Sequence, residues 1–83
     1  MDKKTAIITA ASQGIGKACT RKLSKIKYNL VIMSSSEKIY ALADEVDCVG
    51  FKGSVTNPDD LKNVVELALE TFGRIDSVVN NTG

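Results

Sequence analysis

The sequence contains no histidine and no tryptophan, and its 83 residues include only one proline and two cysteines. Because histidine is absent, a Ser-His catalytic triad and a histidine-rich metal site are excluded, and we predict no metal site. The cysteines, Cys19 and Cys48, lack the short spacing of a redox pair or a metal knuckle. We interpret them as reduced packing residues rather than as a disulfide or a reactive thiol.

The chain also lacks a large excess of charge of either sign. It contains 11 Lys and Arg residues and 10 Asp and Glu residues, which gives a net charge of +1. This balance offers no electrostatic case for nucleic acid or a membrane surface as a partner. No apolar run has the length needed to cross a bilayer, and no stretch resembles a signal peptide, so we expect a cytoplasmic protein. A chain of this length predicts one small domain of marginal stability.

The stretch Thr5–Gly16 has the pattern of a short strand, a tight turn and the start of a helix. Ile7 and Ile8 suit a strand that is buried on both faces, and Gly14 and Gly16 allow the backbone to reverse. Residues 17–26 contain no Gly or Pro and are predicted to be helical. Such a helix directs its unpaired N–H groups and positive dipole end at the turn, where a pyrophosphate can bind. The predicted ligand is therefore a nucleotide, although two glycines at this spacing also occur in ordinary tight turns.

Strands and helices then alternate along the rest of the chain. Apolar runs predict strands at residues 30–33, 48–53 and 77–80, and helical periodicity predicts helices at 39–46 and 58–72. Asn57 before Pro58 is a strong helix start, and Gly73 is a typical helix end. This alternation predicts an α/β, Rossmann-like parallel sheet with helices on both faces and the strand order 3-2-1-4.

Helical spacing also predicts which side chains face the core. For the first helix we expect an apolar face of Ile15, Ala18, Cys19, Leu23 and Ile26. For the last helix we expect an apolar stripe of Leu61, Val64, Val65, Ala68, Leu69 and Phe72. The basic residues of the first helix fall mostly on its other faces. We interpret these basic residues as a solvated surface rather than as a phosphate-binding patch.

Ser34, Ser35 and Ser36 follow the second predicted strand, where the adenosine ribose lies in a dinucleotide site. An Asp or Glu here accepts hydrogen bonds from the ribose hydroxyls and repels a 2′-phosphate, and this NAD-selecting device is absent. Serine hydroxyls can donate to a phosphate, and Lys38 adds positive charge nearby. We therefore prefer NADP over NAD. Ser36 also suits a helix cap with Glu37 in the first turn, and both roles are compatible.

Three segments resemble the short-chain dehydrogenase/reductase family. Residues 9–16 resemble its T-G-x-x-x-G-x-G signature, with Ala10 in place of the first glycine, which requires a negative φ if alanine is to serve there. Residues 72–83, F-G-R-I-D-S-V-V-N-N-T-G, resemble F-G-x-I-D-x-L-V-N-N-A-G, with Thr82 in place of alanine. Residues 53–56 match the stretch where the family usually has Asp-Val, with Ser54 in place of the aspartate that holds the adenine amino group.

The resemblance implies that residues 1–83 are the N-terminal part of a single NAD(P)-binding Rossmann domain, incomplete as it stands. The parent protein is expected to be an oxidoreductase that transfers a hydride between NADP(H) or NAD(H) and a carbonyl or alcohol substrate, and to form a homo-oligomer. Asn80 is expected to brace the central sheet. The predicted cofactor-binding residues are Ala10, Ser12, Gln13, Gly14, Ile15, Gly16, Ser34, Ser35, Ser54, Val55, Asn81, Thr82 and Gly83.

No catalytic residue is predicted within the chain. The family uses a Ser, a Tyr and Lys in Y-x-x-x-K spacing, and an Asn, all beyond the fourth strand. The residues four positions after Tyr28 and Tyr40 are Ile32 and Asp44, so neither tyrosine has this spacing. We expect the chain alone to be inactive. Two alternatives remain: a stand-alone or partner-dependent nucleotide-binding half-domain that pairs through its open fourth strand, and a degenerate family member that retains only an interaction role.

Overall fold

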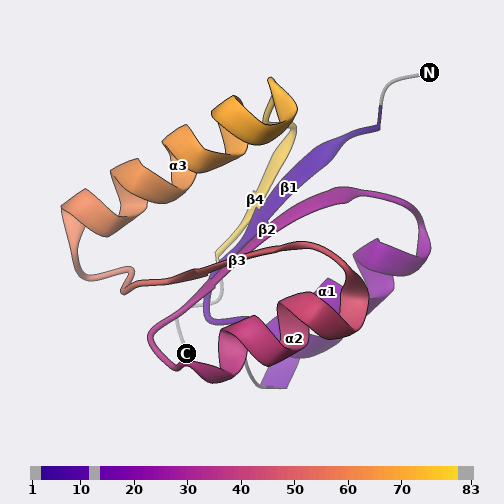
Figure 1. Ribbon diagram of the computed structural model, residues 1–83, viewed down its shortest axis with the longest axis horizontal. Helices are drawn as coiled ribbons and strands as arrows, with labels where there is room; N and C mark the ends of the chain where they lie inside the picture. Colours follow the sequence, from indigo (N-terminus) through magenta and orange to yellow (C-terminus); the bar gives the residue numbers. More distant parts are fainter. Residues whose placement is uncertain (1–2, 12–13, 81–83) are drawn as a thin grey trace.

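The computed structural model describes residues 3–11 and 14–80. Four parallel strands form one sheet in the order β3-β2-β1-β4 (Figure 1). This arrangement confirms the predicted fold class and strand order. The elements in chain order are β1 (Thr5–Ile8), α1 (Gly14–Lys25), β2 (Asn29–Ser34), α2 (Lys38–Val46), β3 (Val49–Lys52), α3 (Pro58–Phe72) and β4 (Ser77–Val79).

The sheet is covered on both faces, with α1 and α2 on one side and α3 on the other (Figure 1). Successive residues of a strand point to opposite faces, so each central strand contributes to two cores. On the α1 and α2 side the core contains Ala6, Ile8, Leu30, Ile32, Ile39 and Leu42. On the α3 side it contains Ile7, Val31, Met33, Val64 and Ala68. The continuous apolar runs of β1 and β2 are thus explained by burial on both faces.

Helix α1 begins at Gly14, earlier than the sequence predicted, and its orientation also differs from the prediction. Ile15 is 74% exposed and Ile26 is 59% exposed, so neither belongs to the core. Ala18 is exposed as well, and the predicted apolar face is therefore wrong for these three residues. Cys19 and Leu23 are half-buried and pack against the core as expected.

The buried residues of α1 are Gly16 and Thr20, which hydrophobic periodicity alone does not select. A Cβ atom at Gly16 would lie 2.3 Å from the carbonyl oxygen of Ala10, so only glycine permits this close approach of helix and turn. The Thr20 hydroxyl donates a 2.8 Å hydrogen bond to the Gly16 carbonyl, which satisfies this buried polar group. The close contact at Gly16 therefore determines which side of α1 faces the sheet.

Helix α2 spans the predicted range 39–46 and begins one residue earlier, and its buried residues are Ile39, Leu42 and Ala43. The Ser36 hydroxyl accepts a 3.2 Å hydrogen bond from the backbone N–H of Lys38, the first helical residue. This bond agrees with the capping role predicted for Ser36, although the residue in the N-cap position is Glu37. The helix ends at Val46, the last residue of the predicted range, and Asp47 caps it with a left-handed φ of 55°.

Helix α3 has the predicted ends. The Asn57 side chain accepts hydrogen bonds from the backbone N–H groups of Asp59 and Asp60, and Gly73 closes the helix with a φ of 77°. Its apolar stripe is only partly buried, because Val64 and Ala68 face the core and Phe72 is half-buried. The prediction is wrong for the remaining members of the stripe, which are exposed: Leu61, Val65 and Leu69.

Cys19 and Cys48 are free thiols that pack at the edge of the core beneath α1 and α2. Burial, and to a smaller extent the neighbouring Asp47 carboxylate, raise the pKa of Cys48 to about 11. A thiol with this pKa is protonated at neutral pH, in agreement with a packing role. Within residues 3–11 and 14–80, no helix combines the length and the apolar character that a membrane span requires.

Candidate cofactor-binding site

The carboxyl ends of the four strands are held together by backbone hydrogen bonds that continue beyond the sheet. The N–H of Ala11 donates to the carbonyl of Met33 at 3.1 Å, and the N–H of Gly53 donates to the carbonyl of Ser34 at 2.9 Å. On the other side of β1, the N–H of Thr9 donates to the carbonyl of Val79 at 3.0 Å. The segments that follow β1, β2 and β3 therefore meet at one edge of the sheet, where open α/β sheets bind ligands.

A cavity of about 170 Å³ lies between these segments. Five of the predicted cofactor-binding residues, from three separate parts of the chain, line this cavity. Two further lining residues, Met33 and Gly53, were not predicted from the sequence. Both missed residues directly precede predicted ones, since Met33 stands before Ser34 and Gly53 stands before Ser54. The lining residues are Ala10, Met33, Ser34, Ser35, Gly53, Ser54 and Val55, none of which is charged.

Ala10 has a φ of 51°, so the structure does not meet the condition of a negative φ that the sequence set for alanine at this position. The turn after β1 requires a left-handed residue at this position, and an L-residue with a Cβ atom is strained there. This requirement is a physical reason for glycine at the corresponding position of the signature. Ala10 is exposed and lines the cavity.

Gly14, Ile15 and Gly16 form the first turn of α1. Gly14 has a φ of 62° with open space around its Cα atom, so its backbone conformation favours glycine, whereas Gly16 is needed for close packing. The first turn contains no acidic side chain, and the positive end of the helix dipole is therefore not neutralised there. None of these three predicted residues lines the cavity, and Ile15 projects into solvent.

The serines after β2 have different environments. Ser34 is buried, and its hydroxyl accepts a 3.2 Å hydrogen bond from the backbone N–H of Ser36, which fixes the turn. Ser35 is exposed and lines the cavity. Of these two predicted residues, Ser35 is thus the one whose hydroxyl is accessible to a ligand.

A second cavity, of about 210 Å³, lies between α1 and α2. Lys17 and Lys38 line it from the two helices, together with Glu45. The Glu45 carboxylate pairs with Arg21 at 2.8 Å, and this hydrogen bond holds the pKa of Glu45 below its usual range. Lys17, which the sequence placed on a solvated surface, and Lys38, which was expected to add positive charge beside the serines after β2, therefore line the same cavity.

The segment after β3 also lines the first cavity, through Gly53, Ser54 and Val55. The Ser54 hydroxyl lies 2.7 Å from the Thr56 hydroxyl and accepts a hydrogen bond from the Thr56 N–H at 3.2 Å. The backbone N–H of Ser54 donates to the Asp60 carboxylate at 3.0 Å. Sequence periodicity does not identify this contact, because a hydrogen bond between a loop and the following helix has no periodic signal.

At the end of β4, the Thr9 hydroxyl donates to the side-chain oxygen of Asn80 at 3.1 Å. This bond links the end of β1 to the end of β4 and agrees with the bracing role expected for Asn80. The other predicted residues lie outside the described residues: Ser12, Gln13, Asn81, Thr82 and Gly83.

The sequence profile of the family described as short chain dehydrogenase matches residues 4–83. This chain belongs to that family. Among its relatives, the oxidoreductase UcpA of Salmonella typhimurium is 41% identical over 85 residues, which cover 96% of this chain and 32% of the relative. The chain thus spans about a third of the length of this relative.

Solved structures agree with the family assignment. A short chain dehydrogenase from Bacillus anthracis superimposes with a TM-score of 0.89 at 30% identity, covering 96% of this chain and 34% of the other. A short-chain dehydrogenase/reductase from Burkholderia phymatum, solved in complex with NAD, superimposes with a TM-score of 0.89 at 26% identity, covering 93% and 30%. The four-stranded sheet is therefore the fold of the corresponding third of these short chain dehydrogenases.

Proposed function

We propose that this chain is the dinucleotide-binding part of an NAD(P)-dependent oxidoreductase, one that transfers a hydride between NADP(H) or NAD(H) and a carbonyl or alcohol substrate. The main observation is the cavity at the carboxyl edge of the sheet, beside the first turn of α1. Family membership supports this function, as does the solved relative that holds NAD. Residues 1–83 then form the N-terminal part of a single Rossmann domain.

Each predicted residue has a proposed role toward the dinucleotide. The first turn of α1, with Gly14 and Gly16, would bind the pyrophosphate through backbone N–H groups and the helix dipole. Ser35 would contact the adenosine ribose, and Val55 would contact the adenine. When bound, the dinucleotide supplies the hydride donor or acceptor. The residues of this chain bind and orient it, and we propose that none of them is catalytic.

We further propose that the cofactor is NADP rather than NAD. Among the residues that the structure describes, no carboxylate lines the first cavity, so none of them repels a 2′-phosphate there. Ser35 is exposed at this cavity, and Lys17 and Lys38 line the neighbouring one together with Glu45. A phosphate beside Ser35 would be attracted by these positive charges.

The test is a titration of the protein with NADPH and with NADH, followed by the fluorescence of the reduced nicotinamide. We expect NADPH to bind more tightly. Ser35→Asp should weaken NADPH binding about tenfold, because a carboxylate then faces the 2′-phosphate, and should leave NADH binding nearly unchanged. Ser77→Asp, which adds the same charge at the exposed start of β4, is the matched control. Equal effects of Ser35→Asp on both cofactors would contradict the placement of the phosphate.

A further inference from the structure

We propose that Asp60 is a positioning residue for the adenine end of the bound dinucleotide. This inference rests on the proposed function, because it concerns the same cavity. Asp60 lies in the first turn of α3, outside the cavity lining, and its carboxylate accepts a 3.0 Å hydrogen bond from the backbone N–H of Ser54. Ser54 itself lines the cavity, so Asp60 acts on the ligand through the backbone of the segment that follows β3.

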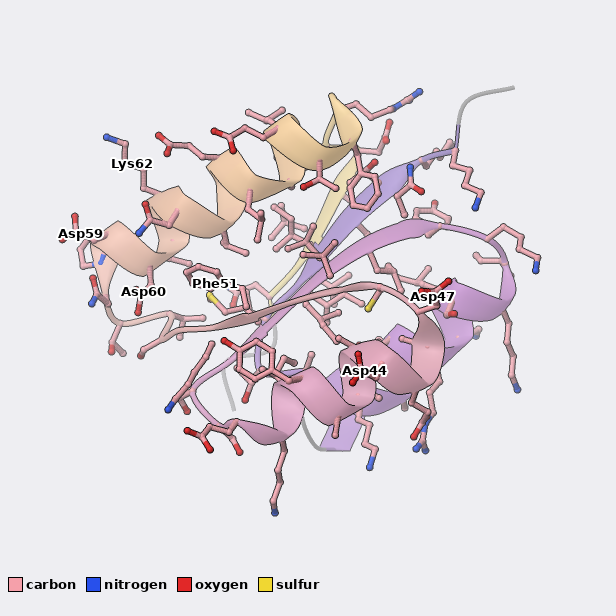
Figure 2. All side chains as sticks on the ribbon, in the orientation of Figure 1. Asp44, Asp47, Phe51, Asp59, Asp60 and Lys62 are labelled. Atoms are coloured by element: carbon pink, nitrogen blue, oxygen red, sulfur yellow. The ribbon has the colours of Figure 1, made fainter. Side chains whose placement is uncertain are left out.

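The packing around Gly53 supports this role. A Cβ atom at Gly53 would lie 3.1 Å from both Cβ and Cγ of Asp60 and 2.6 Å from a ring carbon of Phe51. Because Gly53 has no side chain, Asp60 and Phe51 can pack closely against the segment that follows β3. Figure 2 shows Asp60 pointing from α3 toward the chain that follows β3, whereas Asp59 projects outward from the same turn.

Other hydrogen bonds also hold the segment that follows β3 in place. The N–H of Gly53 is bound to the carbonyl of Ser34, and the carbonyl of Ser54 accepts from the N–H of Asn57 at 3.1 Å. The Ser54 hydroxyl is engaged with Thr56 and is therefore already occupied within the loop. Among the described residues, the backbone N–H and carbonyl of Val55 make no hydrogen bond within the chain, so both are available to a ligand.

These features identify the chemistry that Asp60 would support. Adenine presents an acceptor at N1 and a donor at its 6-amino group, which match one backbone N–H and one backbone carbonyl. Hypoxanthine has an N–H at position 1 and a carbonyl at position 6, and therefore the reverse pattern. By holding Ser54, Asp60 fixes the orientation of the adjacent Val55 peptide groups, so it should control the preference for adenine over hypoxanthine.

The experiment measures the affinities of the protein for 5′-AMP and 5′-IMP by calorimetric titration. We expect wild type to prefer AMP. Asp60→Ala should weaken AMP binding about tenfold and bring the ratio of the two affinities close to one, because a charge-assisted hydrogen bond is lost. Asp60→Asn should largely restore the preference, since its amide oxygen can still accept from Ser54. Asp59→Ala, in the same turn of α3, should leave the ratio unchanged.

The outcomes separate this inference from the proposed function. Equal weakening of AMP and IMP by Asp60→Ala, or an unchanged ratio, would show that Asp60 is only structural. Equal affinity of wild type for AMP and IMP would also refute the inference and leave nucleotide binding intact. Absence of binding to AMP in wild type would refute the proposed function and this inference together. If Asp60→Ala does not fold, Asp60→Glu retains the charge but misplaces the carboxylate, and it should lower the same ratio.

Discussion

At the scale of single residues, Ala10 is the clearest departure from local preference. Its φ of 51° lies in the left-handed region, where an L-residue other than Gly, Asn or Asp is uncommon. The conformation is imposed by its surroundings, since the next residue, Ala11, is tied to β2 and the carbonyl of Ala10 packs against Gly16. The turn that faces the proposed cofactor is therefore strained by a single methyl group.

We predict that Ala10→Gly stabilises the protein by about 1 kcal/mol, because relief of the left-handed strain exceeds the added entropy of the unfolded chain. Urea unfolding measures this change. Ala11→Gly is the matched control: Ala11 is fully buried, so its replacement should destabilise the protein through the loss of a packed methyl group. Destabilisation by Ala10→Gly would contradict the strain argument.

At the scale of elements, Asp76 joins the start of β4 to the start of β1. Its carboxylate accepts a 2.8 Å hydrogen bond from the backbone N–H of Thr5, and its own N–H donates to the Thr5 carbonyl at 2.8 Å. Arg74 also donates to the carboxylate, at 2.9 and 2.6 Å. The hydrogen bond from Arg74, followed by that from Thr5, lowers the pKa of Asp76.

A carboxyl with a lowered pKa in the folded state stabilises the fold above its unfolded pKa of about 3.9. That stability is lost as the pH falls through the lower, folded pKa, because protonation removes the ion pair. We predict that Asp76→Asn, which keeps an acceptor for Thr5, makes the free energy of unfolding less dependent on pH below about 4. Urea unfolding between neutral and acidic pH measures this slope, and identical slopes for wild type and variant would contradict the prediction.

At the scale of the whole molecule, one side exposes apolar residues. Strand β4 is at the edge of the described sheet and pairs only with β1, and Val78 is 57% exposed. Val78 is in register with Ile7, whose side chain faces α3. On α3, Leu61, Val65 and Leu69 recur every four residues and so share one exposed side of the helix. An unpaired strand edge and exposed apolar residues favour association of this chain with itself.

We predict that the protein associates with itself as its concentration rises, as measured by sedimentation velocity. Leu69→Lys and Val78→Lys should each shift the equilibrium toward the monomer, because a buried charge opposes association. Ile26→Lys, an equally drastic change at the exposed end of α1, is the control and should have little effect. A monomer at all concentrations would contradict the prediction.

Much of the fold was predictable because its signals lie in adjacent residues. The buried runs of β1 and β2, the Asn57-Pro58 start of α3 and its end at Gly73 depend on local chemistry, and the structure confirms each of them. The cavity was predictable for a related reason, since the ends of parallel strands meet at one edge of a sheet. Ser35, Ser54 and Val55 follow such strand ends, and they line the same cavity.

The sequence by itself thus determined the order of elements, the parallel sheet and the segments that line the candidate site. Only the tertiary structure decided the rotation of α1, the left-handed Ala10 and the contact between Asp60 and Ser54. These features depend on how closely separate parts of the chain approach one another. Periodicity reports which side of an element is apolar, but the close contact at Gly16 and the hydrogen bond to Asp60 arise only when the elements are packed together.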